Sequence, residues 1–212
     1  MIRETFPVGL LRCNCTILGD ETSRDAIVID PGYDIPRLLA ALNKHELTVR
    51  RIVVTHAHID HIASAFTLKQ LTGAPVFYSK EDLPLVAMID TQASWFGLEV
   101  PKVDPPDHSP VDAETIAIDG IEATVIHTPG HTEGSLCLYV PAANLLISGD
   151  TLFAGGIGRT DLPGGDADQI ITSIRERLLP LPDTTLVIPG HGSTTTIAQE
   201  RATNPFLTGP LG

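Results

Sequence analysis

The sequence places four potential metal ligands within six residues, His56-Ala57-His58-Ile59-Asp60-His61, directly after the segment 51–55. An apolar strand would fix the backbone that enters this run, and a turn would splay successive side chains, with Asp60 and His61 opening a helix. Imidazole nitrogens suit zinc and iron, and a carboxylate serves as a metal ligand or as a proton acceptor. The run therefore favours a metal site at the end of a strand.

Three further candidate ligands, His131, Asp150 and His191, are each preceded by glycine and follow segments typical of buried strands. The glycines allow the backbone to turn sharply and bring these side chains toward a common centre. Taken alone, a histidine in a Gly-Pro turn is more commonly a surface or hydrogen-bonded residue, and a Gly-Asp pair is commonly a turn. Together with the six-residue cluster, they favour one metal site.

Alternating short strands and helices indicate a mixed α and β class within a single domain, residues 1–212. β-branched runs predict strands at residues 26–29, 52–55, 123–127, 145–148 and 185–188. Helices are expected at residues 36–45, 60–71, 80–96, 166–179 and 194–202, with Asp166 as an N-cap. Asp119-Gly120 predicts a hairpin, four prolines in residues 100–111 predict a loop, and residues 204–212 are expected to form an extended C-terminal tail.

The net charge and the N-terminal residues limit the kinds of partner and the location that we expect. A formal net charge of −12 argues against a surface that neutralises phosphate backbones, so nucleic acid is disfavoured. Pro7 and Gly9 interrupt the N-terminal residues, which therefore lack the continuous apolar region of a signal peptide. No apolar run approaches the ~20 residues that span a bilayer. We therefore expect a cytoplasmic protein that acts on a small molecule, without a membrane partner.

The cysteines and the remaining histidines have simpler interpretations. Three cysteines disfavour a disulfide framework, and Cys13 and Cys15 would share one strand face, where packing is favoured over a redox or metal pair. His45 and His108 are expected to be solvated. His127 ends a strand four residues before His131, and a structural role is favoured over a contact behind the metal site.

The ordered set His-x-His-x-Asp-His, Gly-His, Gly-Asp and Gly-His resembles the metallo-β-lactamase superfamily over nearly the whole chain. The resemblance implies an α+β fold, the αββα four-layer sandwich, with two divalent metal ions at one edge. Zinc is the first expectation, and iron and manganese are the alternatives. By this likeness the first metal would be held by His56, His58 and His131, the second by Asp60, His61 and His191, and both by Asp150.

Within that superfamily, residues 149–161 look like those of glyoxalase II, the hydroxyacylglutathione hydrolases, and residues 188–192 and 200–207 resemble their short, single-domain bacterial branch. The resemblance implies hydrolysis of a thioester such as S-lactoylglutathione by hydroxide from a water shared between the metals, which Asp60 would orient. Arg159 would contact the glutathione carboxylate, or it pairs with Asp161 or Asp166. The chain ends soon after His191, without the C-terminal helical domain that supplies further glutathione contacts, so a broader thioester substrate is also open.

Several rivals remain beside this interpretation. A persulfide dioxygenase would use one iron on His56, His131 and Asp150 and would consume oxygen with glutathione persulfide. A β-lactam hydrolase is disfavoured because many of those enzymes carry cysteine where Asp150 stands. The acid excess disfavours a nuclease, and His58 in place of glutamate disfavours a flavo-diiron reductase. A non-catalytic, metal-stabilised binding protein is disfavoured because all seven ligand positions are filled.

Overall fold

The N-terminal half of the chain forms a five-stranded sheet in the order β1-β2-β3-β4-β5, in a computed structural model that describes residues 1–208. β1, β2 and β3 pair antiparallel, whereas β3, β4 and β5 are parallel. Parallel neighbours need crossover connections, and α1 and α3 supply them. The elements are β1 (Ile2–Val8), β2 (Cys13–Gly19), β3 (Asp25–Ile29), α1 (Ile35–Lys44), β4 (Thr48–Val53), α2 (Ile59–Ile62), α3 (Ala65–Thr72) and β5 (Val76–Phe77).

A six-stranded sheet follows, in the order β13-β12-β9-β8-β7-β6, and only its β12–β9 pair is parallel. Its elements are β6 (Thr115–Ile118), β7 (Ile121–His127), β8 (Leu136–Val140), η2 (Pro141–Ala143), β9 (Leu145–Gly149), α6 (Ala167–Ser173), η3 (Ile174–Leu178), β12 (Leu186–Pro189), β13 (Thr195–Thr196), α7 (Ile197–Thr203) and α8 (Pro205–Thr208). Two short strands, β10 (Leu152–Phe153) and β11 (Gly156–Ile157), form a separate ribbon. The segment between the two sheets carries η1 (Lys80–Asp82), α4 (Leu83–Val86) and α5 (Ile89–Phe96).

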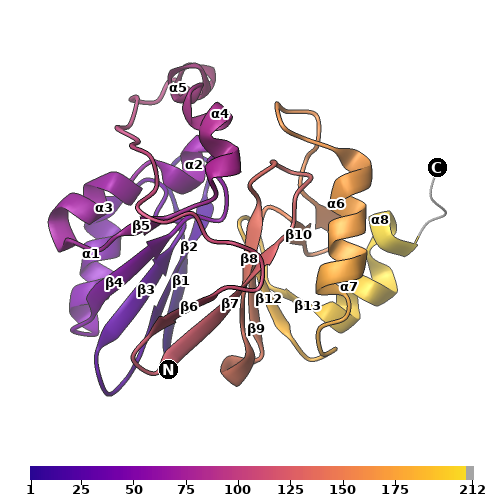
Figure 1. Ribbon diagram of the computed structural model, residues 1–212. Coiled ribbons are helices and arrows are strands. Elements are labelled where there is room, and N and C mark those ends of the chain that lie inside the picture. The colour runs from indigo at the N-terminus through magenta and orange to yellow at the C-terminus, as the bar shows by residue number, and fades with distance from the viewer. Residues whose placement is uncertain (209–212) are drawn as a thin grey trace.

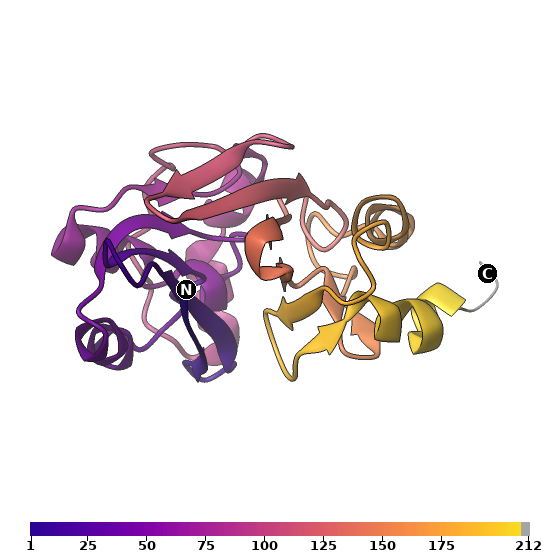
Figure 2. The ribbon, with the colours of Figure 1, turned by 90° about the horizontal axis from the view of Figure 1, so that it is seen from below.

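The buried strands place apolar side chains on both faces of each sheet, and this produces four layers. In β2, Ile17 packs with Leu38 of α1 in the core beneath the first helical layer, whereas Leu18 packs with Leu138 of the second sheet. In β8, the neighbouring Cys137 faces the opposite way, into a third core against α6 and α7. Successive strand residues point to opposite faces, so both sheets are covered on both sides. The predicted αββα sandwich is confirmed, and Figures 1 and 2 show the two sheets side by side with helices outside.

Two of the expected helices are interrupted. The helix expected over residues 60–71 is divided into α2 and α3, because the Ser64 amide donates to the Gly32 carbonyl (2.6 Å) and leaves the helical pattern. The helix expected over 80–96 consists of η1, α4 and α5, with Pro84 in the first turn of α4. A proline fits the first turn of a helix but not its interior. The helix expected at 194–202 begins later, at Ile197, because Thr195 and Thr196 pair with β12.

The predicted extended tail is wrong for residues 205–208, which form α8. Asn204 is fully buried, its Nδ2 donates to the carbonyl of Gly156 (3.0 Å), and its Oδ1 accepts from the Phe206 amide (3.1 Å). Pro205 then supplies a preset backbone angle and no surplus N–H at the start of the helix. Residues 209–212 of the expected tail lie outside the described residues. Among residues 1–208, no helix combines the length and apolar character that a membrane crossing requires.

Candidate metal centre

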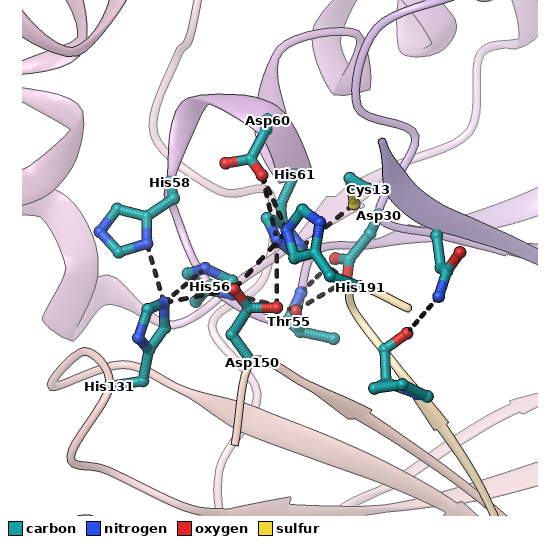
Figure 3. A network of polar contacts seen from close by, with 12 residues as sticks. Cys13, Asp30, Thr55, His56, His58, Asp60, His61, His131, Asp150 and His191 are labelled. Atoms are coloured by element: carbon teal, nitrogen blue, oxygen red, sulfur yellow. Dashed lines mark hydrogen bonds and ion pairs between the residues drawn. The ribbon is translucent and has the colours of Figure 1, made fainter. Parts of the chain in front are cut away.

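The structure brings all seven predicted ligand residues together at one edge of the sandwich (Figure 3). The loops that carry them follow β4, β7, β9 and β12, and α2 carries Asp60 and His61. Close packing there depends on Gly190, since a Cβ at that position would lie 2.1 Å from Asp150 Oδ1 and 2.7 Å from His61 Cε1. The glycines before these ligands thus allow close approach as well as sharp turns.

Three histidine nitrogens converge in the first half of the centre. His131 Nε2 lies 2.9 Å from His58 Nδ1 and 3.2 Å from His56 Nε2. All three side chains are buried, with at most 8% of their surface exposed. These three atoms are the donor set that the sequence analysis expected for the first metal.

In His131 and His56, a hydrogen bond made by Nδ1 determines that Nε2, which faces the centre, is bare, that is, carries no proton. His131 Nδ1 donates to the Arg159 carbonyl (2.7 Å), which leaves no proton on Nε2 of the neutral ring. The Thr55 hydroxyl donates to Asp30 (2.8 Å), so it accepts from His56 Nδ1 (3.2 Å), and His56 Nε2 is also bare. Two lone pairs facing each other repel unless a cation lies between them.

Asp60, His61 and His191 form the second half of the centre. His191 Nε2 is 3.0 Å from Asp60 Oδ2, and His61 Nε2 is 3.6 Å from the same oxygen. On its other side, His61 Nδ1 lies 3.0 Å from Asp30 Oδ2. Asp30 therefore accepts a hydrogen bond from Nδ1–H and orients Nε2 toward the centre.

Asp150 lies between the two halves. Its Oδ1 is 3.5 Å from His61 Nε2, and its Oδ2 is 3.6 Å from His131 Nε2 and 3.7 Å from His191 Nε2. One carboxylate thus faces ligands of both halves, which is the position that a bridging ligand requires.

The chemistry of this donor set fits divalent cations. His61 Nε2 and Asp150 Oδ1 are buried and have no hydrogen-bond partner among residues 1–208. Unpaired buried polar atoms are costly, and a cation shared by these two atoms would satisfy both. The mixed imidazole and carboxylate ligands suit zinc, iron or manganese.

The electrostatics of the two halves differ. Burial, reinforced by the neighbouring histidines, lowers the pKa of His56 far below its usual range and that of His58 to about 3, so both rings are neutral at neutral pH. Burial also opposes protonation of His61, but Cys13 and the carboxylates around it outweigh burial and raise its pKa. Burial likewise opposes the ionisation of Asp60, yet His61 and His191 hold its pKa below the usual range. The carboxylates of the second half therefore stabilise positive charge, which favours a bound cation.

Comparison with known proteins places this geometry in a family. The model of the metallo-beta-lactamase superfamily matches residues 8–191, which include all seven candidate ligands. The chain belongs to the metallo-β-lactamase superfamily.

Relatives of this superfamily match nearly the full chain. The hydroxyacylglutathione hydrolase GloC of Haemophilus influenzae is 39% identical over 208 residues, which cover 96% of this chain and 97% of GloC. Among solved structures, BLEG-1, described as a B3 metallo-beta-lactamase, has a TM-score of 0.91 and 35% identity, and covers 98% of this chain and 100% of its own. TTHA1623 in a di-iron-bound form has a TM-score of 0.86 and 37% identity, with the same coverage of both chains. The chain is thus a member of this metallo-hydrolase superfamily.

A cleft of about 280 Å³ opens beside the seven-residue centre. Leu11, Trp95, Phe96 and Leu162 form the apolar part of its lining, which also includes Arg159. The Arg159 guanidinium makes two hydrogen bonds to Asp161 (2.8 and 2.7 Å), as one of the sequence interpretations expected, and both side chains are more than half exposed. An exposed pair contributes little to stability, so a substrate carboxylate could replace Asp161 at small cost.

Sequence reasoning missed the residues that hold the ligand loops from behind. Asp30 accepts hydrogen bonds from the Thr55 amide (2.7 Å) and hydroxyl (2.8 Å) and contacts His61. Asp82 accepts from the Ala57 amide (2.8 Å) in the first ligand loop. Gln92 accepts from the Ile59 amide (2.9 Å). Asp30 follows β3 directly and begins the turn-forming sequence Asp-Pro-Gly, whereas no local pattern marks Asp82 or Gln92.

The other histidines and the cysteines lie outside the predicted ligand set. His127 Nε2 contacts the Glu133 carbonyl (2.9 Å), which is a structural contact. His45 and His108 were expected to be solvated, but they pair with Glu4 and Glu114, respectively (both 2.6 Å). All three cysteines are free and buried. Cys15 packs in the core as expected, and Cys13 Sγ also lies 3.4 Å from His61 Nδ1.

Proposed function

We propose that this chain is a metal-dependent thioester hydrolase that acts on small thioesters such as S-lactoylglutathione. The observation that carries the proposal is the convergence of the seven ligand-type side chains, with two buried atoms unpaired, beside an open cleft. His56, His58 and His131 would hold one divalent cation, Asp60, His61 and His191 a second, and Asp150 would contact both.

The similarity to GloC supports the thioester. Its name specifies a hydroxyacylglutathione hydrolase, and the alignment spans 97% of that protein, so the likeness extends beyond the metal ligands. The di-iron form of TTHA1623 supports a centre for two metals.

The residues of the chain have distinct parts in the proposed reaction. Divalent cations bound here would lower the pKa of water and polarise a carbonyl oxygen. The Asp60 carboxylate accepts a hydrogen bond from the attacking water and orients it toward the thioester carbon. The water oxygen bonds to that carbon and the carbon–sulfur bond breaks. One water proton goes to the departing thiolate and the other to solvent, so a carboxylate and a thiol are released. Asp30 and the Arg159 carbonyl keep His61 and His131 in the required orientation.

The assay compares S-lactoylglutathione with a β-lactam, using protein loaded with zinc, iron or manganese. Release of glutathione that depends on metal and is lost in Asp60→Ala is expected, with little β-lactam turnover. BLEG-1 makes the β-lactam the appropriate comparison substrate. Efficient β-lactam opening without thioester cleavage would overturn the proposal.

Arg159 is the residue proposed to contact a substrate carboxylate. Arg159→Ala should remove a charge-assisted hydrogen bond worth roughly 1.5 to 3 kcal/mol, or about ten- to a hundredfold in kcat/KM for S-lactoylglutathione. Metal content and the rate with a simple acyl thioester should be unchanged, because the side chain is exposed and, among residues 1–208, its guanidinium pairs only with Asp161. Equal losses on both substrates would show that Arg159 has a structural role instead.

A further inference from the structure

The part of the cleft wall formed by α5 is fixed relative to the ligand loop. Gln92 of α5 accepts from the Ile59 amide, next to His58 and Asp60, and its Nε2 donates to the Leu85 carbonyl (2.8 Å). Gln92 and Ala93 are buried, so α5 is anchored on this side. Trp95 follows Gln92 by three residues and therefore lies on a neighbouring part of the same helix face.

Two large aromatic side chains in this cleft remain open to solvent. Trp95 is 48% exposed and Phe96 is 41% exposed, although nearby residues of α5 are buried. In Figure 1, α4 and α5 stand above the ends of the sheets, opposite the loop that precedes α6. Adjacent exposed aromatic groups in a concave site are typical of a surface that binds an apolar ligand.

The charged residues that line the cleft further limit the kinds of ligand that it can bind. Among the residues that line it, Arg159 is the one lysine or arginine. The two lining carboxylates, Asp60 and Asp150, belong to the candidate metal centre. A substrate with several carboxylates finds a single basic partner here, whereas an alkyl or aryl group finds Leu11, Trp95, Phe96 and Leu162.

We infer that the cleft selects thioesters that carry an apolar alkyl or aryl group, and that Trp95 and Phe96 determine this specificity. The inference rests on the proposed thioester hydrolysis for its substrate, but the apolar recognition can be measured without turnover. Each methylene that the aromatic wall removes from water should raise kcat/KM roughly fourfold.

The first experiment measures binding in the zinc-loaded protein. Trp95 is the single tryptophan of the chain, so its fluorescence reports on the cleft directly. The probes are the S-methyl and S-hexyl thioethers of N-acetylcysteamine, which have no scissile carbonyl–sulfur bond. We expect the S-hexyl probe to shift the Trp95 emission and to bind at least tenfold more tightly than the S-methyl probe. Equal affinities, or calorimetric binding that leaves the emission unchanged, would overturn the inference whether or not the protein hydrolyses thioesters.

The second experiment measures kcat/KM in two series of thioesters. In one, the acyl group is acetyl, butanoyl or hexanoyl on a constant thiol; in the other, the thiol is lengthened with a constant acetyl group. The series that shows the preference identifies which side of the thioester contacts Trp95, and a preference in neither overturns the inference. Trp95→Ala should reduce the preference for the long chain about tenfold, and Trp95→Phe should restore most of it.

Phe206 provides a matched control for these variants. It is an aromatic residue of similar exposure, 53%, in α8 and does not line the cleft. Phe206→Ala should keep the wild-type preference, and an equal loss in Phe206→Ala and Trp95→Ala would contradict a specific role. If the S-hexyl probe binds more tightly than the S-methyl probe but no thioester is hydrolysed, the proposed function is wrong, whereas the apolar binding site is supported.

Discussion

Replacement of Asp82 should weaken both the fold and the metal centre, because this side chain ties together two ligand loops. Its Oδ2 accepts from the Ala57 amide (2.8 Å) and the Thr132 hydroxyl (3.1 Å), and its Oδ1 accepts from the Gly134 amide (2.7 Å). Ala57 lies between His56 and His58, and Thr132 follows His131. Asp82 is 1% exposed, so in the folded protein these donors are paired with its carboxylate instead of with bulk water.

The magnitude follows from the donors that Asp82→Ala leaves unpaired. Two buried backbone amides, each costing about 1 to 3 kcal/mol, give a gross loss of several kcal/mol. Burial raises the pKa of Asp82 despite these donors, which shows that the buried carboxylate itself carries a desolvation cost. Removing that cost offsets part of the loss, so we expect a net decrease of about 3 kcal/mol in the free energy of unfolding. Asp82→Asn keeps one acceptor oxygen and should lose about half as much.

The assay has one readout for each effect. Urea unfolding of the metal-free protein measures the free energy of unfolding, and calorimetry at a temperature where both proteins are folded measures zinc affinity. We expect zinc affinity to fall about ten- to a hundredfold, as for other residues that orient ligands from behind. Glu81→Ala, which removes the exposed acidic neighbour, is the control. Destabilisation with unchanged zinc affinity would refute the positioning role of Asp82.

Three further predictions concern other parts of the chain. Hydrogen bonds from His45, and then from Lys44, lower the pKa of Glu4 from its ordinary value of 4.5, so Glu4→Gln should reduce the free energy of unfolding by roughly 0.5 kcal/mol at neutral pH. The resulting difference in Tm between the variant and the wild type should vanish as the pH falls through the lowered pKa of Glu4. A difference in Tm that stays constant with pH would contradict this prediction. Gly190→Ala should lower metal content, since its Cβ would overlap Asp150, whereas Gly73→Ala, with no atom within 4 Å of the new Cβ, should retain it. Asn204→Ala should cost about 2 kcal/mol in thermal unfolding by removing buried hydrogen bonds, and an unchanged Tm would be inconsistent with its contacts.

Residue type and position relative to strands were sufficient to predict the ligand set that the structure brings together. His56 to His61 combine dense ligand chemistry with a preceding strand, and Asp150 and His191 follow strands that are parallel neighbours, β9 and β12. Parallel strands end at the same edge of a sheet, so the sequence pattern carries three-dimensional information. The family resemblance added the four-layer arrangement, which periodicity alone did not give.

The supporting residues could not be predicted because their contacts are long-range. Asp82 is 25 residues from Ala57 and 52 from Gly134, and Asp30 is 31 residues from His61. A single aspartate belongs to no repeated sequence pattern, so the sequence does not distinguish a buried aspartate from one in a turn or on the surface. The tail was misjudged for a related reason, since burial of Asn204 depends on Gly156, 48 residues earlier.

Metal titration of the metal-free protein measures directly whether the seven-residue centre holds two ions. Zinc is added in known equivalents while bound metal and hydrolysis of an acyl thioester are followed on the same samples. We expect two ions to bind per chain and full hydrolysis to require both, because Asp150 faces the two halves of the centre. Binding that saturates at one ion, or full activity with one ion bound, would contradict it.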